Sequence, residues 1–284
     1  MTDLSELRSL EAPGSLEAPS VNPEIPNAAR MYDYYLGGLH NFAADRAAAE
    51  RTKAAMPWVS HAARANRNFL RRAVRFCRQQ GIDQFLDLGS GIPTVGNVHE
   101  VARAGNSDAR VSYVDNEPVT VAACVALLAG DPLATITAMD IRDPDAVFAA
   151  PGVRDLLDFS RPVALLTVAV LHFVPDEDDP AGLMAEYRGR LAPGSFHALS
   201  HATGDHDPER AAAGVATFKT TANPINIRTW DQVAQMFGGL PLVEPGLVDA
   251  TRWHPDDTVG PEHTGSWAGV ARIGGSPTGN GSGA

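Results

Sequence analysis

The chain has little cysteine, almost no lysine and no long hydrophobic segment. Its 284 residues include two cysteines, Cys77 and Cys124, which lack a C-x-x-C spacing. This excludes a disulfide framework and predicts buried, reduced thiols. No apolar run approaches the roughly 20 residues that a membrane span requires, and the N-terminus lacks the basic and apolar regions of a secretory signal. These absences predict a soluble, cytoplasmic protein without a membrane partner.

The basic residues are few and are nearly all arginines. Lys53 and Lys219 are the two lysines, and the 34 acidic residues leave a formal net charge of -11. Proteins bind phosphate groups mainly through clustered Lys and Arg, so an acidic chain argues against nucleic acid as a partner. The chain is 44% hydrophobic, which suffices for one large core or two small ones.

Two terminal segments are predicted to be disordered. Residues 1–26 contain the sequence Ser-Leu-Glu-Ala-Pro twice and few large apolar residues. Residues 274–284 are rich in Gly and Ser. Between them, 27–80 is predicted to form a helical cap and 81–273 a single cofactor-binding domain.

The predicted cap includes helices over Ala43–Ala55 and from about Ser60 to Gln80. Ala65, Phe69, Ala73 and Phe76 recur at three- or four-residue spacing in the second helix and predict its buried stripe. Its other face carries six arginines, namely Arg64, Arg67, Arg71, Arg72, Arg75 and Arg78. A phosphate-binding ridge and a solvated face are both possible there, and the acidic net charge favours the solvated face.

Seven short apolar runs follow, and helical patterns separate most of them. They cover residues 84–88, 111–114, 134–138, 163–170, 195–200, 242–248 and 266–272. Strands that alternate with helices indicate βαβ units and a parallel sheet covered on both faces. The sequence therefore predicts an α/β fold, a Rossmann-like seven-stranded and mostly parallel sheet with an N-terminal helical cap. The last two runs lie close together and predict an antiparallel hairpin at the sheet edge.

Ligands of open α/β sheets bind beyond the carboxyl ends of the strands. The residues there are Asp87, Gly89, Ser90 and Gly91 at the first run, Asp115 and Asn116 after the second, Asp140 and Ile141 after the third, and Val170 at the end of the fourth, followed by Leu171, His172 and Phe173. The glycines let the backbone approach a ligand where a Cβ would clash. Carboxylates after the second and third runs can accept hydrogen bonds from ribose hydroxyls and an adenine amine.

A dinucleotide is a poor match for this loop. The G-x-G-x-x-G fingerprint lacks its third glycine, because Thr94 stands there. Asp87 would lie close to a pyrophosphate, and Asp115 follows it at more than the roughly 20 residues typical of dinucleotide sites. An adenosine without phosphates and with a positive charge fits better, which points to S-adenosylmethionine (SAM).

The motifs resemble those of known SAM enzymes. Asp87–Gly91, Asp115, Asp140–Ile141 and Val170–Asp176 look like the successive motifs of class I SAM-dependent methyltransferases. Five further segments resemble a bacterial family of SAM methyltransferases that was first catalogued as a domain of unknown function. These segments are Ala29–Gly38, Asn41–Arg46, Ala65–Ala73, Pro93–Ala102 and Ala198–Ala202.

The resemblance implies the Rossmann-like fold and SAM as cofactor, and little about the acceptor. We expect a SAM-dependent methyltransferase whose acceptor is a small molecule, since the chain is acidic. A non-catalytic SAM-binding sensor or partner protein is the alternative. The missing glycine disfavours a nucleotide-dependent oxidoreductase, and the absence of a G-x-S-x-G elbow counts against a hydrolase. The sequence predicts neither the methylated atom nor the oligomeric state.

Several site residues have a second, purely structural interpretation. Asp115 could cap the helix that starts near Pro118, and Asp140 could belong to the turn before Pro144. The segment 30–41 could close a helical cap, or cover the cofactor pocket with Tyr32 or Tyr35 near SAM.

Histidine chemistry is similarly open in the sequence. His172 could act as a general base, since its ordinary pKa is near 6.5, or shape the pocket through its backbone. His40, His197 and His201 are weaker candidates. No pair of histidines has the spacing of metal ligands, so no metal is predicted.

Overall fold

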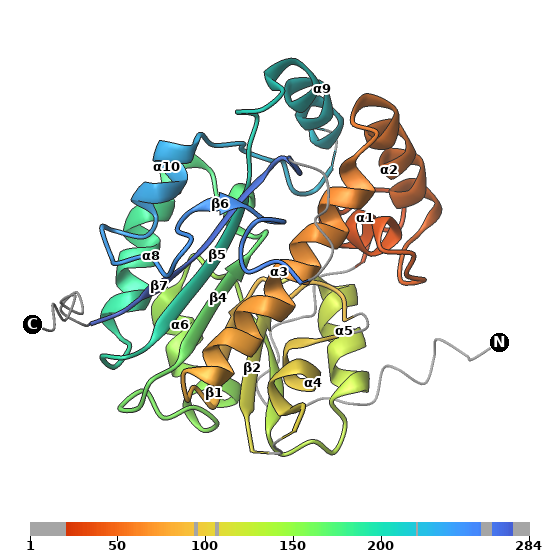
Figure 1. Ribbon diagram of the computed structural model, residues 1–284. Coiled ribbons are helices and arrows are strands. Elements are labelled where there is room, and N and C mark those ends of the chain that lie inside the picture. Colours follow the sequence, from red (N-terminus) through yellow and green to blue (C-terminus); the bar gives the residue numbers. More distant parts are fainter. Residues whose placement is uncertain (1–20, 94–95, 106–107, 220, 257–262, 275–284) are drawn as a thin grey trace, which may run out of the picture.

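The computed structural model describes residues 21–93, 96–105, 108–219, 221–256 and 263–274. A seven-stranded sheet forms its centre, with helices on both faces (Figure 1). The strands are β1 (Gln84–Leu88), β2 (Arg110–Asp115), β3 (Ala134–Ala138), β4 (Ala164–Val168), β5 (Phe196–Ala202), β6 (Val248–Asp249) and β7 (Ser266–Arg272). Their order is β3-β2-β1-β4-β5-β7-β6, and β7 runs antiparallel to both of its neighbours. The predicted Rossmann-like fold is confirmed.

Helices precede and connect these strands. They are α1 (Ala28–Tyr35), α2 (Ala43–Ala55), α3 (Val59–Gln79), α4 (Val98–Arg103), α5 (Pro118–Leu127), α6 (Pro144–Ala149), α7 (Pro151–Arg154), α8 (Pro180–Gly189), α9 (Pro208–Phe218) and α10 (Trp230–Gln235), with the 3-10 turns η2 (Leu171–Phe173) and η3 (Asp176–Asp178). The helices predicted over Ala43–Ala55 and Ser60–Gln80 match α2 and α3.

Each face of the sheet has its own hydrophobic core. Strand β1 is buried along its whole length: Phe85 packs in the core under α3 and α4, and Leu86 and Leu88 pack in the core under α6 to α8. Such continuous apolar strands are typical of a parallel sheet covered on both sides. The strand order reverses between β1 and β4, and this places the carboxyl ends of β1, β2 and β4 around one crevice.

The arginine face of α3 is not a uniformly solvated surface. Arg64 and Arg75 are exposed, but Arg67 and Arg72 are buried. The Arg72 guanidinium donates hydrogen bonds to the carbonyls of Trp253 and Ala250 at 2.8 and 2.6 Å. The solvated interpretation is therefore wrong for these two residues, because tertiary contacts with the 250–253 segment replace water around Arg72.

The strand predicted over 242–248 is largely absent. Strand β6 contains Val248 and Asp249, and Leu242 forms a single bridge to Ala271. Pro245 has no N–H to donate to a ladder, and Gly246 has a φ of +92°. These two residues prevent the apolar run from forming a continuous strand. The predicted antiparallel pair at the sheet edge survives as the short contact between β6 and β7.

Helices α1 and α2 pack together and against α9, at the carboxyl end of the parallel strands (Figure 1). Their shared core includes Met31, Ala48 and Phe218. Helix α3 instead lies across the sheet, so the domain boundary at residue 80 remains a prediction. The predicted disordered residues 1–20 and 275–284 lie outside the described residues.

Both cysteines are buried free thiols, as predicted. Among the described residues, no helix is both long and apolar enough to cross a membrane.

Candidate functional site

A cavity of about 780 Å³ lies where the strand order reverses. Residues after β1, β2, β3 and β4 line one side, and residues of α1, α3 and α9 line the other. Cavities that hold drug-sized ligands span roughly 300–1,000 Å³. This volume therefore lies in the range of sites that hold small-molecule ligands.

The glycine loop after β1 borders the cavity. Gly89 has a φ of +70°, and a Cβ there would meet Val170 Cγ2 at 2.2 Å. Gly91 has a φ of +65° and open space in the direction of a Cβ. The N–H groups of Gly89 and Ser90 donate to the Val114 carbonyl at 2.8 and 3.2 Å. The loop is thus fixed to the end of β2, and no side chain stands between Gly91 and a ligand.

Asp115 is the last residue of β2 and is 8% exposed. Its Oδ2 accepts from the Gly91 N–H at 2.8 Å, and its Oδ1 accepts from the Glu117 N–H at 2.9 Å. Burial raises its pKa to about 6. A carboxylate offers about four acceptor positions, so these two N–H groups leave positions on Asp115 that a ligand could use. Asn116 follows at the exposed edge of the cavity.

The helix-cap interpretation of Asp115 is wrong. Helix α5 begins at Pro118, and Glu117 is its N-cap, with its side chain accepting from the Thr120 N–H at 3.0 Å. Proline at the first helical position fixes where the helix starts, which leaves Asp115 outside it.

Asp87 lies in β1, just before the glycine loop, and is 4% exposed. Burial raises its pKa to about 7, Arg67 lowers it, and the nearby Asp115 raises it. A carboxylate in such surroundings gains from a cationic ligand, because the added charge stabilises its ionised form.

Asp140 lies after β3, half-buried at the cavity wall. Burial raises its pKa, but hydrogen bonds from Arg142 outweigh this and lower it overall. Arg142 Nη2 lies 2.6 Å from Asp140 Oδ2. Asp143, not Asp140, caps α6 by accepting from the Ala146 N–H. Ile141 also lines the cavity, and its carbonyl accepts from the Tyr187 hydroxyl at 2.8 Å.

The residues after β4 have different surroundings, since some line the cavity and one is buried in the hydrophobic core. Val170 and His172 line the cavity, whereas Leu171 is fully buried in the hydrophobic core and is not part of the lining. Of the predicted cofactor residues, Leu171 is the one that the fold turns away from the site, since the 3-10 turn η2 begins there.

The sequence left two roles open for His172, a general base and a structural contact through its backbone, and the structure is compatible with both. Its carbonyl accepts from the Asn226 N–H at 2.7 Å, which is a structural contact. Its Nδ1 is buried and has no hydrogen-bond partner among the described residues. Burial lowers its pKa well below 6.5, and His201 and Arg228 lower it further. The imidazole is therefore neutral at physiological pH.

Sequence reasoning missed Arg228, which organises this segment. Its buried guanidinium donates to the carbonyls of Leu171 and Val174 and to Asp176 Oδ1, at 3.0, 2.8 and 2.6 Å. It also donates to His201 Nε2 at 2.9 Å. His201 Nδ1 then donates to the Ala202 carbonyl. No local pattern marks Arg228, because its partners come from distant parts of the chain.

The cap meets the site through α1. The Tyr32 hydroxyl forms two hydrogen bonds to α3. It donates to the Ala63 carbonyl at 2.9 Å and accepts from the Asn66 side-chain amide at 3.1 Å. Both Tyr32 and Tyr35 line the cavity. Arg30, also missed, binds Asp45 at 2.8 Å and Glu117 at 2.6 Å. The salt bridge to Glu117 ties the cap to the residue that caps α5, two positions beyond Asp115.

Of the three weaker histidine candidates, His201 lines the cavity, whereas His40 and His197 do not. His40 is exposed and does not line the cavity. His197 is buried beside Thr167, and burial lowers its pKa to about 3.

The chain matches known proteins over most of its length. The S-adenosyl methyltransferase family matches residues 15–274. A DUF574 family protein from Streptomyces avermitilis is 37% identical with a TM-score of 0.84, and the match covers 88% of this chain and 98% of that one. A proposed methyltransferase from Thermobifida fusca is 39% identical with a TM-score of 0.84, over 89% of this chain and 96% of that one. No curated protein matches.

The residues present fit the cofactor that this family implies. Gly91 leaves open space beside the backbone, Asp115 keeps acceptor positions for a ribose, and Asp87 is a buried acid whose pKa is raised overall by burial, so that a cationic ligand would stabilise its ionised form. The chain belongs to the S-adenosyl methyltransferase family and is a SAM-dependent methyltransferase with the class I fold.

Proposed function

We propose that this enzyme methylates a small, largely apolar acceptor that binds between the cofactor and the helical cap. The cavity carries this proposal, because it continues from the glycine loop to side chains of α1, α3 and α9. The lining contributed by the cap, by α9 and by the loops after β4 and α9, here called the far part, includes the apolar and aromatic side chains Tyr35, Met56, Val59, Phe173, Phe218 and Ile225. Such a lining favours an apolar body, and the volume limits its size.

The near part of the cavity is assigned to the cofactor. Asp115 would accept both ribose hydroxyls, Asp140 would accept from the adenine amine, and Ile141 and Val170 would border the base. The Gly89-Ser90-Gly91 backbone would lie along the methionine portion, with Asp87 balancing its positive charge. When bound, SAM supplies a methyl group already activated by a sulfonium.

The protein's own contribution is alignment and the exclusion of water. A reaction with an activated methyl group depends mainly on holding the acceptor atom in line with it. The buried side chains of the cap keep water from that position. His172, a neutral imidazole on the cavity wall, can take the proton that an acceptor hydroxyl or amine loses.

The test is methyl transfer from methyl-labelled SAM to a panel of small phenols, alcohols and amines with apolar bodies. We expect labelled product with at least one of these classes. Phe218→Ala, which enlarges the far part of the cavity, is expected to raise the KM for the acceptor and to leave S-adenosylhomocysteine (SAH) binding unchanged. Leu39→Ala is the matched control, because Leu39 is 92% exposed and outside the cavity. Transfer to protein or nucleic acid and to no small molecule would refute the proposal.

A further inference from the structure

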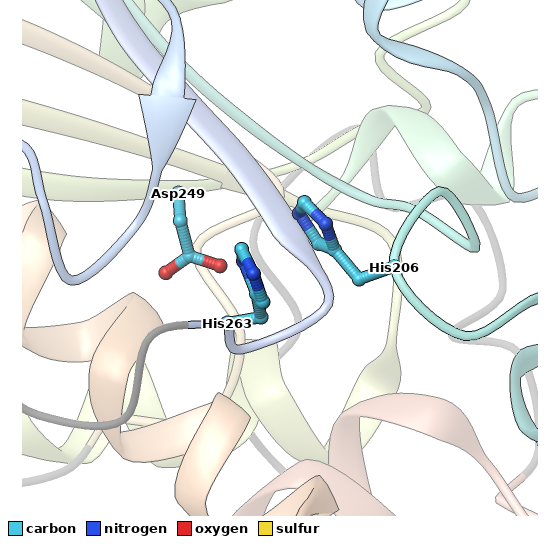
Figure 2. Close-up of side chains that lie close together, drawn as sticks. All are labelled: His206, Asp249 and His263. Carbon is cyan, nitrogen blue, oxygen red and sulfur yellow. The ribbon is translucent and has the colours of Figure 1, made fainter.

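Three side chains with metal-binding atoms gather at one end of the cavity. His206 lies in the loop between β5 and α9, Asp249 ends β6, and His263 lies just before β7 (Figure 2). One donor atom from each side chain lies within 4.8 Å of the other two. Both imidazoles line the cavity. The residues are distant in sequence, so their spacing gave no signal of a site.

Asp249 is held in a fixed orientation. It is 4% exposed, and Thr251 and Thr264 donate to it through both backbone and hydroxyl groups. Three of these hydrogen bonds reach Oδ1, and only the Thr264 N–H, at 2.6 Å, reaches Oδ2. Since each carboxylate oxygen has about two acceptor positions, the described residues leave one position of Oδ2 open. Outer hydrogen bonds of this kind orient carboxylate ligands in metal sites.

The two imidazoles are stacked against each other. Their ring centroids lie 3.9 Å apart with an interplanar angle of 18°, and Trp267 packs at 4.7 Å from the His206 ring. Neither ring makes a hydrogen bond to another residue in the described part of the chain. Two neighbouring imidazoles cannot both be protonated without repulsion. As neutral rings they can bind one cation after one of them rotates out of the stack, because the in-plane lone pairs of parallel rings do not converge.

We propose that His206, Asp249 and His263 bind one divalent transition-metal ion, with Zn²⁺ as the best match. Two imidazoles and one carboxylate make up a common set of three protein ligands, which leaves one or more coordination positions open. Zinc-ligand bonds of about 2.0–2.1 Å place tetrahedral donors about 3.4 Å apart. The exposed histidines close the remaining gap by rotating about their side-chain bonds.

The ion would join the loop after β5, the end of β6 and the start of β7 into one wall of the cavity. Its open coordination position is available to an oxygen atom of the acceptor. This second statement rests on the proposed function, whereas binding of the ion does not.

The experiment uses full-length protein without an affinity tag, first dialysed against a chelator. Calorimetric titration with Zn²⁺, and Co²⁺ titration followed by visible absorption, measure stoichiometry and affinity. We expect one ion per chain. Loss of even an outer partner of a metal ligand weakens binding by about 10–100-fold, so His206→Gln and His263→Gln are each expected to weaken it at least tenfold. His40→Gln, which changes an exposed histidine outside the cluster, should have no effect.

SAH binding is measured on the same samples, because it reports the folded cofactor site independently of the ion. If a variant does not fold, carbethoxylation of wild-type protein replaces it: Zn²⁺ should protect His206 and His263, and not His40, from modification mapped by mass spectrometry. The proposal is wrong if no stoichiometric ion binds, if binding survives both substitutions, or if Zn²⁺ protects neither histidine. Intact ion binding in a protein that methylates nothing small would contradict the proposed function instead.

Discussion

Replacement of Asp115 is the sharpest perturbation of the proposed cofactor site. The carboxylate ends β2, holds the Gly91 and Glu117 N–H groups, and keeps acceptor positions that a ligand could use. Asp115→Ala removes both proposed hydrogen bonds to the ribose and frees the glycine loop. Asp115→Asn keeps the shape but replaces one acceptor oxygen with an amide donor.

The expected magnitude follows from these contacts. A hydrogen bond to a charged group contributes about 1.5–3 kcal/mol, so two such bonds account for about 3 kcal/mol at the lower limit. Each 1.4 kcal/mol changes a Kd about tenfold. Asp115→Ala should therefore weaken SAH binding about a hundredfold or more. Asp115→Asn should lose about tenfold, because one acceptor remains.

The assay is calorimetric titration of SAH into each purified variant, with thermal unfolding as the check on folding. Asp155→Ala is the matched control, since Asp155 is an exposed acid outside the cavity and is paired only with Arg154 among the described residues. It should bind SAH as the wild type does. A folded Asp115→Ala protein that binds SAH within threefold of wild type would refute the assignment of Asp115 to the ribose.

Three further predictions concern other parts of the site. Burial raises the pKa of Asp87 to about 7, and a bound cation lowers this pKa again, so SAM binding should release a proton from Asp87. The affinity for SAM should therefore rise between pH 5 and pH 7, by up to about tenfold per pH unit for one proton. Calorimetry should find a smaller rise in Asp87→Asn. His172 lines the cavity and is the proposed base for the acceptor proton, so His172→Gln should lower kcat by about 10²–10⁴-fold and leave SAH affinity unchanged. An unchanged kcat would show that His172 contributes its backbone contact alone. Arg30→Met leaves Asp45 and Glu117 buried without their partner and should lower the free energy of unfolding in urea by about 3–5 kcal/mol, whereas Arg154→Met, at an exposed ion pair, should not change it.

The features that the sequence predicts well depend on neighbours along the chain. The β1 strand, the Gly89 and Gly91 positions and the acid at the end of β2 form a local pattern, and the structure places them around one cavity. The mostly parallel sheet is predicted for the same reason, since strands that alternate with helices along the chain allow few arrangements. Their roles toward SAM remain predictions until a ligand is bound.

The features that the sequence does not predict depend on tertiary contacts. Arg67 and Arg72 share the pattern of a solvated helix face, but the fold buries them. Other contacts join residues that are far apart in the sequence, so local spacing does not predict them. They involve Arg30, Arg228 and the His206–Asp249–His263 group. The 242–248 run has strand-like composition, and Pro245 and Gly246 prevent it from forming a regular strand.

The most direct test of this account is a crystal structure of the protein with SAH. We predict that the ribose hydroxyls lie within hydrogen-bond distance of the Asp115 carboxylate, with the adenine beside Asp140 and Ile141. The sulfur atom should face the part of the cavity lined by His172 and Phe218. SAH bound elsewhere, or bound at the glycine loop with its ribose away from Asp115, would contradict the account.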